Sequence, residues 1–292
     1  MQIVEMRLAD IDPDDAYSIT FPHLPERYDR IEDGFPGIPL LVIDEARRVV
    51  SGHDYRLLLR WRGESRVRAL QVELPLEEGL LLNFSIMDRL FGLNLYEKLL
   101  FVKKLSPLLP PAEIQRRADL GFHLGDSLLR RLDMLLSAPF RSCLASGRLG
   151  LKTALKLAAE EKGDREAQLG VFQACGFSES QQWQVVQALD ELAFKKKKPI
   201  AALLKSASLL SLLEGEMPQR RFMDALNARR YPLLSRMEKE WREWRGKALG
   251  PGIVSVDHAP LFASQEIQVT LAVKDRAAAE ELLRRLEKSP AH

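Results

Sequence analysis

The sequence predicts a mostly helical α+β protein, and three observations lead to this fold class. Short β-branched runs separated by turn residues occur in the first quarter of the chain. From residue 76 onward, apolar side chains recur at the spacing of an amphipathic helix. Near the C-terminus the pattern returns to alternation and then to one last helix. These patterns predict a small mixed α/β domain, a central helix-turn-helix domain, a helical extension and a small β-β-α unit, at residues 1–94, 95–160, 161–249 and 250–292.

The N-terminal domain is predicted from strands that surround one short helix. The strands are expected at residues 2–6, 38–43, 48–51 and 67–74, and the helix at residues 57–61. This order of strands and helix indicates a small sheet of mixed direction.

Gly52 follows the third of these strands and precedes the helix. A glycine at this place lets the N–H groups at the start of a helix face an anion such as a phosphate. His53 and Arg56 are the candidate side chains beside it, whereas Asp54 would repel a phosphate unless a metal ion intervened. The alternative is that Gly52 only supports a tight turn and that His53 is a surface residue.

Two short helices in the central domain are joined by a turn that contains glycine. Pro111 suits the first position of a helix, which is expected to end at Leu120 and Gly121. Asp126 or Ser127 is expected to cap the second helix. Such a pair, with arginines on the outer face of its second helix, is typical of a DNA-reading helix-turn-helix. An ordinary helical bundle with solvated arginines is the alternative.

Positive charge is concentrated in this region. Residues 111–157 contain 8 Lys and Arg against 4 Asp and Glu, whereas residues 1–105 contain 14 against 18. Because duplex DNA carries one negative charge per ~1.7 Å of its axis, clustered basic side chains favour contact with its phosphates. The candidates for DNA contact are Arg116, Arg117, Ser127, Arg130, Arg131, Arg148, Lys152 and Lys156.

The segments LLRRLDMLLSAP and FRSCLASGRLGLKTALKLA, at residues 128–139 and 140–158, carry a family resemblance. Together with the helix before them, they resemble the helix-turn-helix region of ParB-type chromosome-partition proteins. That family has a leucine-rich helix ending near a proline, a short helix, and then a glycine, a basic residue and a leucine before the next helix. The turn at residues 121–125 looks longer here than is usual in the family.

The segment SGHDYRLLL, at residues 51–59, resembles the N-terminal domain shared by ParB-type proteins and sulfiredoxins. The resemblance implies a nucleotide site, with CTP and Mg²⁺ as its ligands. Asp54 and Tyr55 stand where the family has an arginine-rich run, and the Asn and Arg of its second motif are six residues apart here, not three. The residues implied for this site are Gly52, His53, Arg56, Asn83 and Arg89.

Composition limits the class of protein. An apolar content of 46% and a charged content of 29% are those of a globular protein, and no run reaches the roughly 20 apolar residues of a membrane span. Cys143 and Cys175 have no cysteine or histidine near them in the sequence, so neither a disulfide nor a metal site is expected. A cytoplasmic protein without a membrane partner is therefore expected, and the family resemblance implies association with the nucleoid.

The leading hypothesis is a dimeric DNA-binding protein of the ParB-like type. The resemblance implies a role in chromosome or plasmid partition or in transcriptional regulation, a clamp gated by CTP, and a partition ATPase as a partner. A homodimer is expected through residues 250–292, because about 40 residues bury little core alone. An enzyme with nuclease or other phosphoryl chemistry, or with weak CTPase activity, is one alternative. A structural adaptor that has lost both ligands is another.

Overall fold

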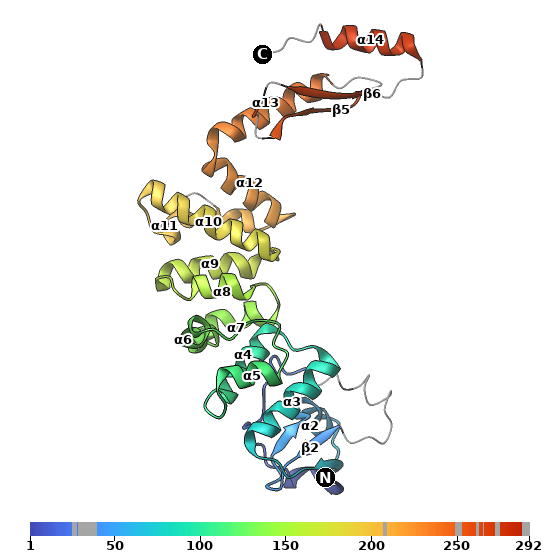
Figure 1. Cartoon of the computed structure of the whole chain (residues 1–292), viewed down its shortest axis with the longest axis vertical. Coiled ribbons are helices and arrows are strands. Elements are labelled where there is room, and N and C mark those ends of the chain that lie inside the picture. The colour runs from blue at the N-terminus through green and yellow to red at the C-terminus, as the bar shows by residue number, and fades with distance from the viewer. Residues whose placement is uncertain are drawn as a thin grey trace.

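In the computed structural model of this chain, the described residues are 1–24, 28, 40–206, 209–248, 253–260, 263–264, 266–271 and 275–287. Helices make up most of them, and the strands form one four-stranded and one two-stranded sheet. The predicted mostly helical α+β class is thus confirmed. The elements follow one another in chain order along the long axis of the molecule (Figure 1).

The four-stranded sheet contains the N-terminal strands. They are β1 (Gln2–Arg7), β2 (Leu41–Ile43), β3 (Val49–Ser51) and β4 (Arg66–Gln71), and the 3-10 helix η1 (Leu8–Asp10) follows β1. The strand order is β1-β4-β2-β3, in which β2 runs parallel to β4 and the other neighbours are antiparallel. The predicted strands are present, except that residues 38–39 lie outside the described part of the chain.

A different helix covers each face of this sheet. Leu41 and Ile43 share a core with Leu58 of α2 (His53–Trp61). Val42 and Val50 belong instead to the core that contains α3 (Leu76–Phe91). Successive side chains of a strand point to opposite faces, so the alternation along β2 separates the two cores.

The helices after α3 stack in layers that extend the molecule. α4 packs against α6 and α7, these against α8 and α9, and α10 packs against α8, α11 and α12. One continuous apolar core runs through these layers from Tyr17 to Leu226. The bounds are α4 (Leu95–Leu105), α5 (Pro111–Arg117), α6 (Asp126–Leu135), α7 (Ala138–Ala145), α8 (Leu151–Leu157), α9 (Lys162–Ala174), α10 (Glu179–Lys196), α11 (Ile200–Ser206), η2 (Leu210–Leu213) and α12 (Pro218–Arg230).

The C-terminal part has the predicted β-β-α order. Tyr231 separates α12 from α13 (Pro232–Ala248), and Pro232 begins the second of these helices. Strands β5 (Ile253–His258) and β6 (Ile267–Leu271) pair in antiparallel fashion before α14 (Arg276–Glu287). The ring of Trp241 on α13 meets the ring of His258 edge-on at 4.9 Å, which joins α13 to β5. Residues 249–252, between α13 and β5, lie outside the described residues.

Candidate phosphate and nucleic-acid sites

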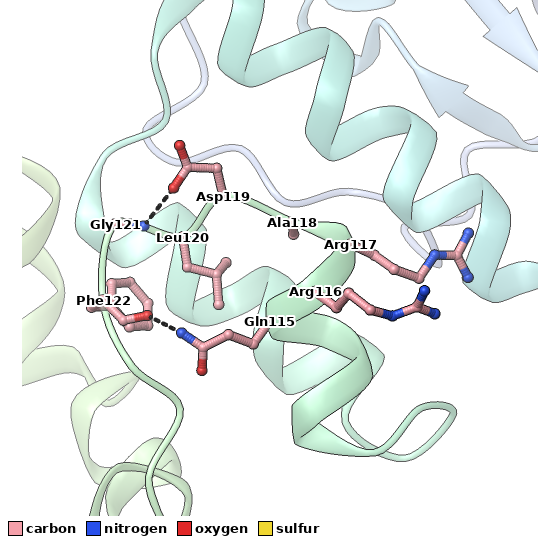
Figure 2. Close-up of a pocket in the computed structure, with 8 residues that line it drawn as sticks. All are labelled: Gln115, Arg116, Arg117, Ala118, Asp119, Leu120, Gly121 and Phe122. Carbon is pink, nitrogen blue, oxygen red and sulfur yellow. Dashed lines mark hydrogen bonds between the residues drawn. The ribbon is translucent and has the colours of Figure 1, made fainter.

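The connection between α5 and α6 is held by two polar side chains. The Gln115 amide donates to the carbonyl of Phe122 at 3.0 Å and accepts the N–H of Leu124 at 2.9 Å. The Asp119 carboxylate accepts the N–H of Gly121 at 3.2 Å. Figure 2 shows both side chains turned toward the connection, around an open hollow of about 450 Å³ that residues 115–122 line.

These contacts correct the predicted helix ends. The first helix ends at Arg117 and not at Leu120, because Ala118 is already extended and is buried. The second helix is capped by Gly125, without a side-chain hydrogen bond, and not by Asp126 or Ser127. The connection therefore spans residues 118–125, whereas the usual helix-turn-helix turn has about 3–4 residues.

Helix α6 buries one face and exposes the other. Leu128, Leu132 and Leu135 are buried, and the helix packs chiefly against α4 and α8. Arg130 lies on the exposed side. Arg131 is half-buried and donates to the Ser127 hydroxyl at 2.8 Å, one turn earlier. The exposed side of α6 thus presents an arginine pair and a hydroxyl, as the sequence predicted.

Acidic residues neutralise the arginines of α5. Arg117 pairs with Glu78 of α3 at 2.5 Å, and this hydrogen bond lowers the pKa of Glu78. Arg116 lies 3.6 Å from Glu113, one turn away on the same helix. In Figure 2 both guanidinium groups extend away from the connection. Arg117 therefore joins α5 to the α/β domain.

The three basic candidates beyond α7 also have partners. The Arg148 guanidinium donates to the carbonyl of Gln173, and the Lys152 ammonium lies 3.9 Å from the centre of the Trp183 ring. Lys156 pairs with Glu160 at 3.1 Å and with Asp190 at 3.0 Å. Among the eight candidates, Arg130 alone makes no hydrogen bond, ion pair or ring contact with the residues that the structure describes.

Gly52 has a backbone conformation that only glycine adopts without strain. Its φ is +93°, and a Cβ atom at this place would lie 2.5 Å from the carbonyl oxygen of Leu40. Gly52 is the N-cap of α2 and provides no side-chain cap. Helix α2 therefore begins at His53, four residues before the predicted start at Leu57, and its first N–H groups are left for other partners.

Buried polar atoms without a partner gather around this helix start. His53 is only 8% exposed, so the alternative of a surface histidine is wrong. Burial lowers the pKa of His53 to about 4, although the nearby Asp15 opposes this. Within the described residues, no hydrogen-bond partner is found for His53 Nε2, Ser51 Oγ and Arg56 Nε. Polar atoms that are buried without partners are costly, so each calls for a partner such as water, an ion or a ligand.

Asp54 does not stand alone beside this helix start. Its side chain has no exposed surface, and one carboxylate oxygen lies 2.5 Å from Nδ1 of His23. The other oxygen accepts the N–H of Leu24 at 3.4 Å. The Asp54 carboxylate therefore binds the segment around residues 23–24, and a protonated His23 would offset its charge.

Asn83 and Arg89 are not brought together. Asn83 is buried and donates to the carbonyl of Tyr17 at 2.7 Å, which ties α3 to the preceding segment. Arg89 is exposed. Six residues turn a helix through about 600°, so the two side chains leave α3 in directions about 120° apart.

Sequence reasoning missed several residues beside His53. Asp15, His23 and Lys104 all interact electrostatically with it, and the Lys104 ammonium donates to the carbonyls of Asp15 and Ala16. Segment 15–24 is irregular and α4 is distant in the sequence, so no local pattern joins these groups to Gly52. The long-range fold alone assembles them.

In the described residues, no group of three or more His, Cys, Asp or Glu side chains could hold a metal ion. None of the described helices has the length and apolar content to cross a bilayer. No protein-family model and no curated protein sequence matches this chain.

Proposed function

We propose that this protein binds double-stranded DNA through α6, in the manner of ParB-like proteins. The observation that carries the proposal is the exposed face of α6, where Arg130 has no partner in the described residues and Arg131 lies beside Ser127. An arginine with free donors can contact a guanine edge or a phosphate, and a hydroxyl can contact either. Because the other basic candidates have partners within the chain, α6 supplies the specific part of the contact.

The test replaces Arg130 and Arg131 with alanine. Duplexes selected from a random pool by the wild-type chain should bind the double variant at least about 30-fold more weakly, because each arginine contributes about 1–3 kcal/mol. The control is Arg220→Ala with Arg276→Ala, two exposed arginines of α12 and α14 that each lie near an acid one turn away. A folded double variant with unchanged affinity would refute DNA reading by α6.

A second function, nucleotide binding at the start of α2, is supported by the unpartnered polar atoms there. The uncapped N–H groups after Gly52 and the Arg56 guanidinium suit the phosphates of a nucleotide. CTP with Mg²⁺ is the ligand that the family resemblance implies, and bound Mg²⁺ would neutralise phosphate charge near Asp54. His53, neutral at pH 7, would contribute a hydrogen bond and not a charge.

Calorimetry with each of the four nucleoside triphosphates and Mg²⁺ tests this second function. CTP should bind more tightly than the other three, and Arg56→Gln should weaken its binding about tenfold, the usual size of a charge-assisted contact. Arg60→Gln is the matched control, because Arg60 is exposed on the same helix one turn later. Equal binding of all four nucleotides, or none at millimolar concentration, would exclude a CTP site.

The wider role follows from both contacts. A homodimer joined by residues 253–287 would place two copies of α6 on one duplex, and CTP binding would close the two N-terminal domains around it. Chromosome or plasmid partition, with an ATPase partner, or transcriptional regulation at the nucleoid would use such a clamp. Removing residues 253–292 should turn a dimer into a monomer in sedimentation, and an unchanged number of chains per particle would contradict the dimer.

A further inference from the structure

The C-terminal end of α10 carries an exposed phenylalanine followed by four exposed lysines. Phe194 is 86% exposed, and residues 195–198 are all exposed. Lys197 is the C-cap of α10 in the left-handed region, with φ +50°. The N–H groups of Lys197 and Lys198 bind the carbonyls of the last turn at 3.2–3.3 Å, which fixes this end of the helix. We name Phe194 and Lys195–Lys198 the α10 basic end.

Helix stability does not explain this composition. Glycine or asparagine is the favoured residue at a left-handed helix end, and a lysine there is strained. Four adjacent lysines also repel one another. One or two basic residues would be enough to interact with the dipole of the last turn.

In the part of the chain that the structure describes, these four charges form no ion pair with a carboxylate, although Lys195 interacts electrostatically with Glu191. In the described residues no Asp or Glu oxygen lies within 4 Å of the four ammonium groups. Glu191, one turn before Lys195, is bound by Arg230. Asp164, which lies across from this end on α9, accepts the N–H of Ala201 at 2.9 Å. The basic candidates of α5 and α8, in contrast, are mostly paired.

We propose that the α10 basic end binds the phosphodiester backbone of nucleic acid, as a sequence-independent contact beside the one made by α6. The choice of nucleic acid as the polyanion rests on the proposed function. α6 packs against α8, and α8 packs against α10. Two steps of helix packing place the axes of α6 and α10 at most about 20 Å apart at their closest approach. That distance is well within one turn of B-DNA, about 34 Å.

The apolar surface of α10 favours nucleic acid over an anionic membrane. Val185, Val186, Leu189 and Leu192 of this helix are buried in the core, and Trp183 is half-buried near the other end of the helix, against Lys152. One exposed ring provides no apolar face to enter the lipid headgroup region, which a membrane-binding helix requires. A phosphodiester backbone needs only point charges, with the Phe194 ring against a sugar or a base.

The experiment measures binding of the full chain to a random-sequence duplex of 20 base pairs between 50 and 300 mM salt. Replacing Lys195–Lys198 with glutamine should weaken binding at 50 mM salt at least tenfold. It should also make the slope of log K against log salt less negative by about 3–4, because each lost phosphate contact removes about 0.9 from its magnitude. Phe194→Ala should weaken binding a few-fold and leave the slope unchanged, because no charge is lost.

The matched control removes the same formal charge elsewhere. It replaces Lys162, Arg220, Lys239 and Arg276 with glutamine, four exposed side chains that each lie near an acid one turn away. This control should change the slope by less than half as much. Circular dichroism confirms that both variants fold.

Three results would overturn the inference. The first is an unchanged salt slope in the lysine variant, and the second is an equal change of slope in the control variant. The third is a lysine variant that loses binding to phosphatidylserine vesicles but keeps its DNA binding, which would indicate a membrane contact. The Arg130→Ala, Arg131→Ala variant is measured in parallel on the selected duplex. If the arginine variant binds DNA like the wild type and the lysine variant does not, α6 does not read DNA and the lysine contact stands. If the lysine variant binds DNA like the wild type and the arginine variant does not, α6 reads DNA and the lysine contact is refuted.

Discussion

The start of α2 and the outer surface of α5 and α6 differ in whether their polar side chains have partners within the chain. At the start of α2, His53 and Arg56 place polar atoms in buried positions and leave them without partners in the described residues. On α5 and beyond, the basic side chains lie nearer the solvent, and most pair with an acid, as Arg117 does with Glu78. In the sequence, basic side chains beside a glycine predict a ligand contact in both regions.

The difference separates side chains that stabilise the fold from side chains available to a ligand. A surface ion pair contributes little energy, but it fixes the position of both side chains and satisfies their donors. A buried donor without a partner weakens the folded state and gains the most from a ligand. The partner of a charged residue is therefore a better guide to its role than the charge itself.

Replacing Gly52 by alanine should cause the largest loss in the free energy of unfolding, because it disrupts the start of α2. A Cβ atom would meet the Leu40 carbonyl at 2.5 Å, in a conformation with φ +93°. Strain and overpacking together should lower the free energy of unfolding by about 2–5 kcal/mol. Gly63→Ala is the control, because Gly63 has φ +76° but nothing within 4 Å, and it should lose only about 1 kcal/mol. Urea unfolding measures both, and equal losses would contradict the steric argument.

Acid should destabilise the protein through His53, because this side chain is buried and its pKa is lowered. The folded pKa of about 4 lies below the usual 6.5, so the unfolded chain binds the proton more readily between these values. The stabilisation by neutral His53 is therefore complete above about pH 6.5 and is lost as the pH falls toward 4. The total is on the order of 3 kcal/mol.

Urea unfolding at several pH values tests this prediction. His53→Gln should flatten the pH dependence between 6.5 and 4. His123→Gln, on the exposed connection between α5 and α6, should leave it unchanged. A wild-type chain whose free energy of unfolding is constant over this window would show that His53 is not buried in the neutral form.

The smallest expected effect comes from comparing a paired and an unpaired basic residue of the helical region, Lys156 and Arg130. Lys156→Gln breaks the pairs with Glu160 and Asp190 and should lower the free energy of unfolding by about 0.5–1 kcal/mol. Binding of a selected duplex should stay within about twofold. Arg130→Gln should do the reverse, with stability within about 0.5 kcal/mol of wild type and weaker DNA binding. The same response of both variants in both measurements would remove the distinction between paired and unpaired residues.

The sequence by itself determined the elements and several of their ends. Pro111 predicts a helix start that the structure contains, because proline suits the first position of a helix. The β-branched runs predict the strands of the small mixed sheet. The class of fold follows from these local patterns.

Only the tertiary structure decided which candidate side chains are available. The pairing of Arg117 with Glu78 joins residues 39 positions apart, and the contact between His23 and Asp54 joins residues 31 positions apart. No local pattern encodes such pairs, because burial and charge neutralisation depend on which helices pack together. The early start of α2 and the long connection before α6 have the same origin. A left-handed glycine against Leu40 and the two hydrogen bonds of Gln115 override the local preference of the chain.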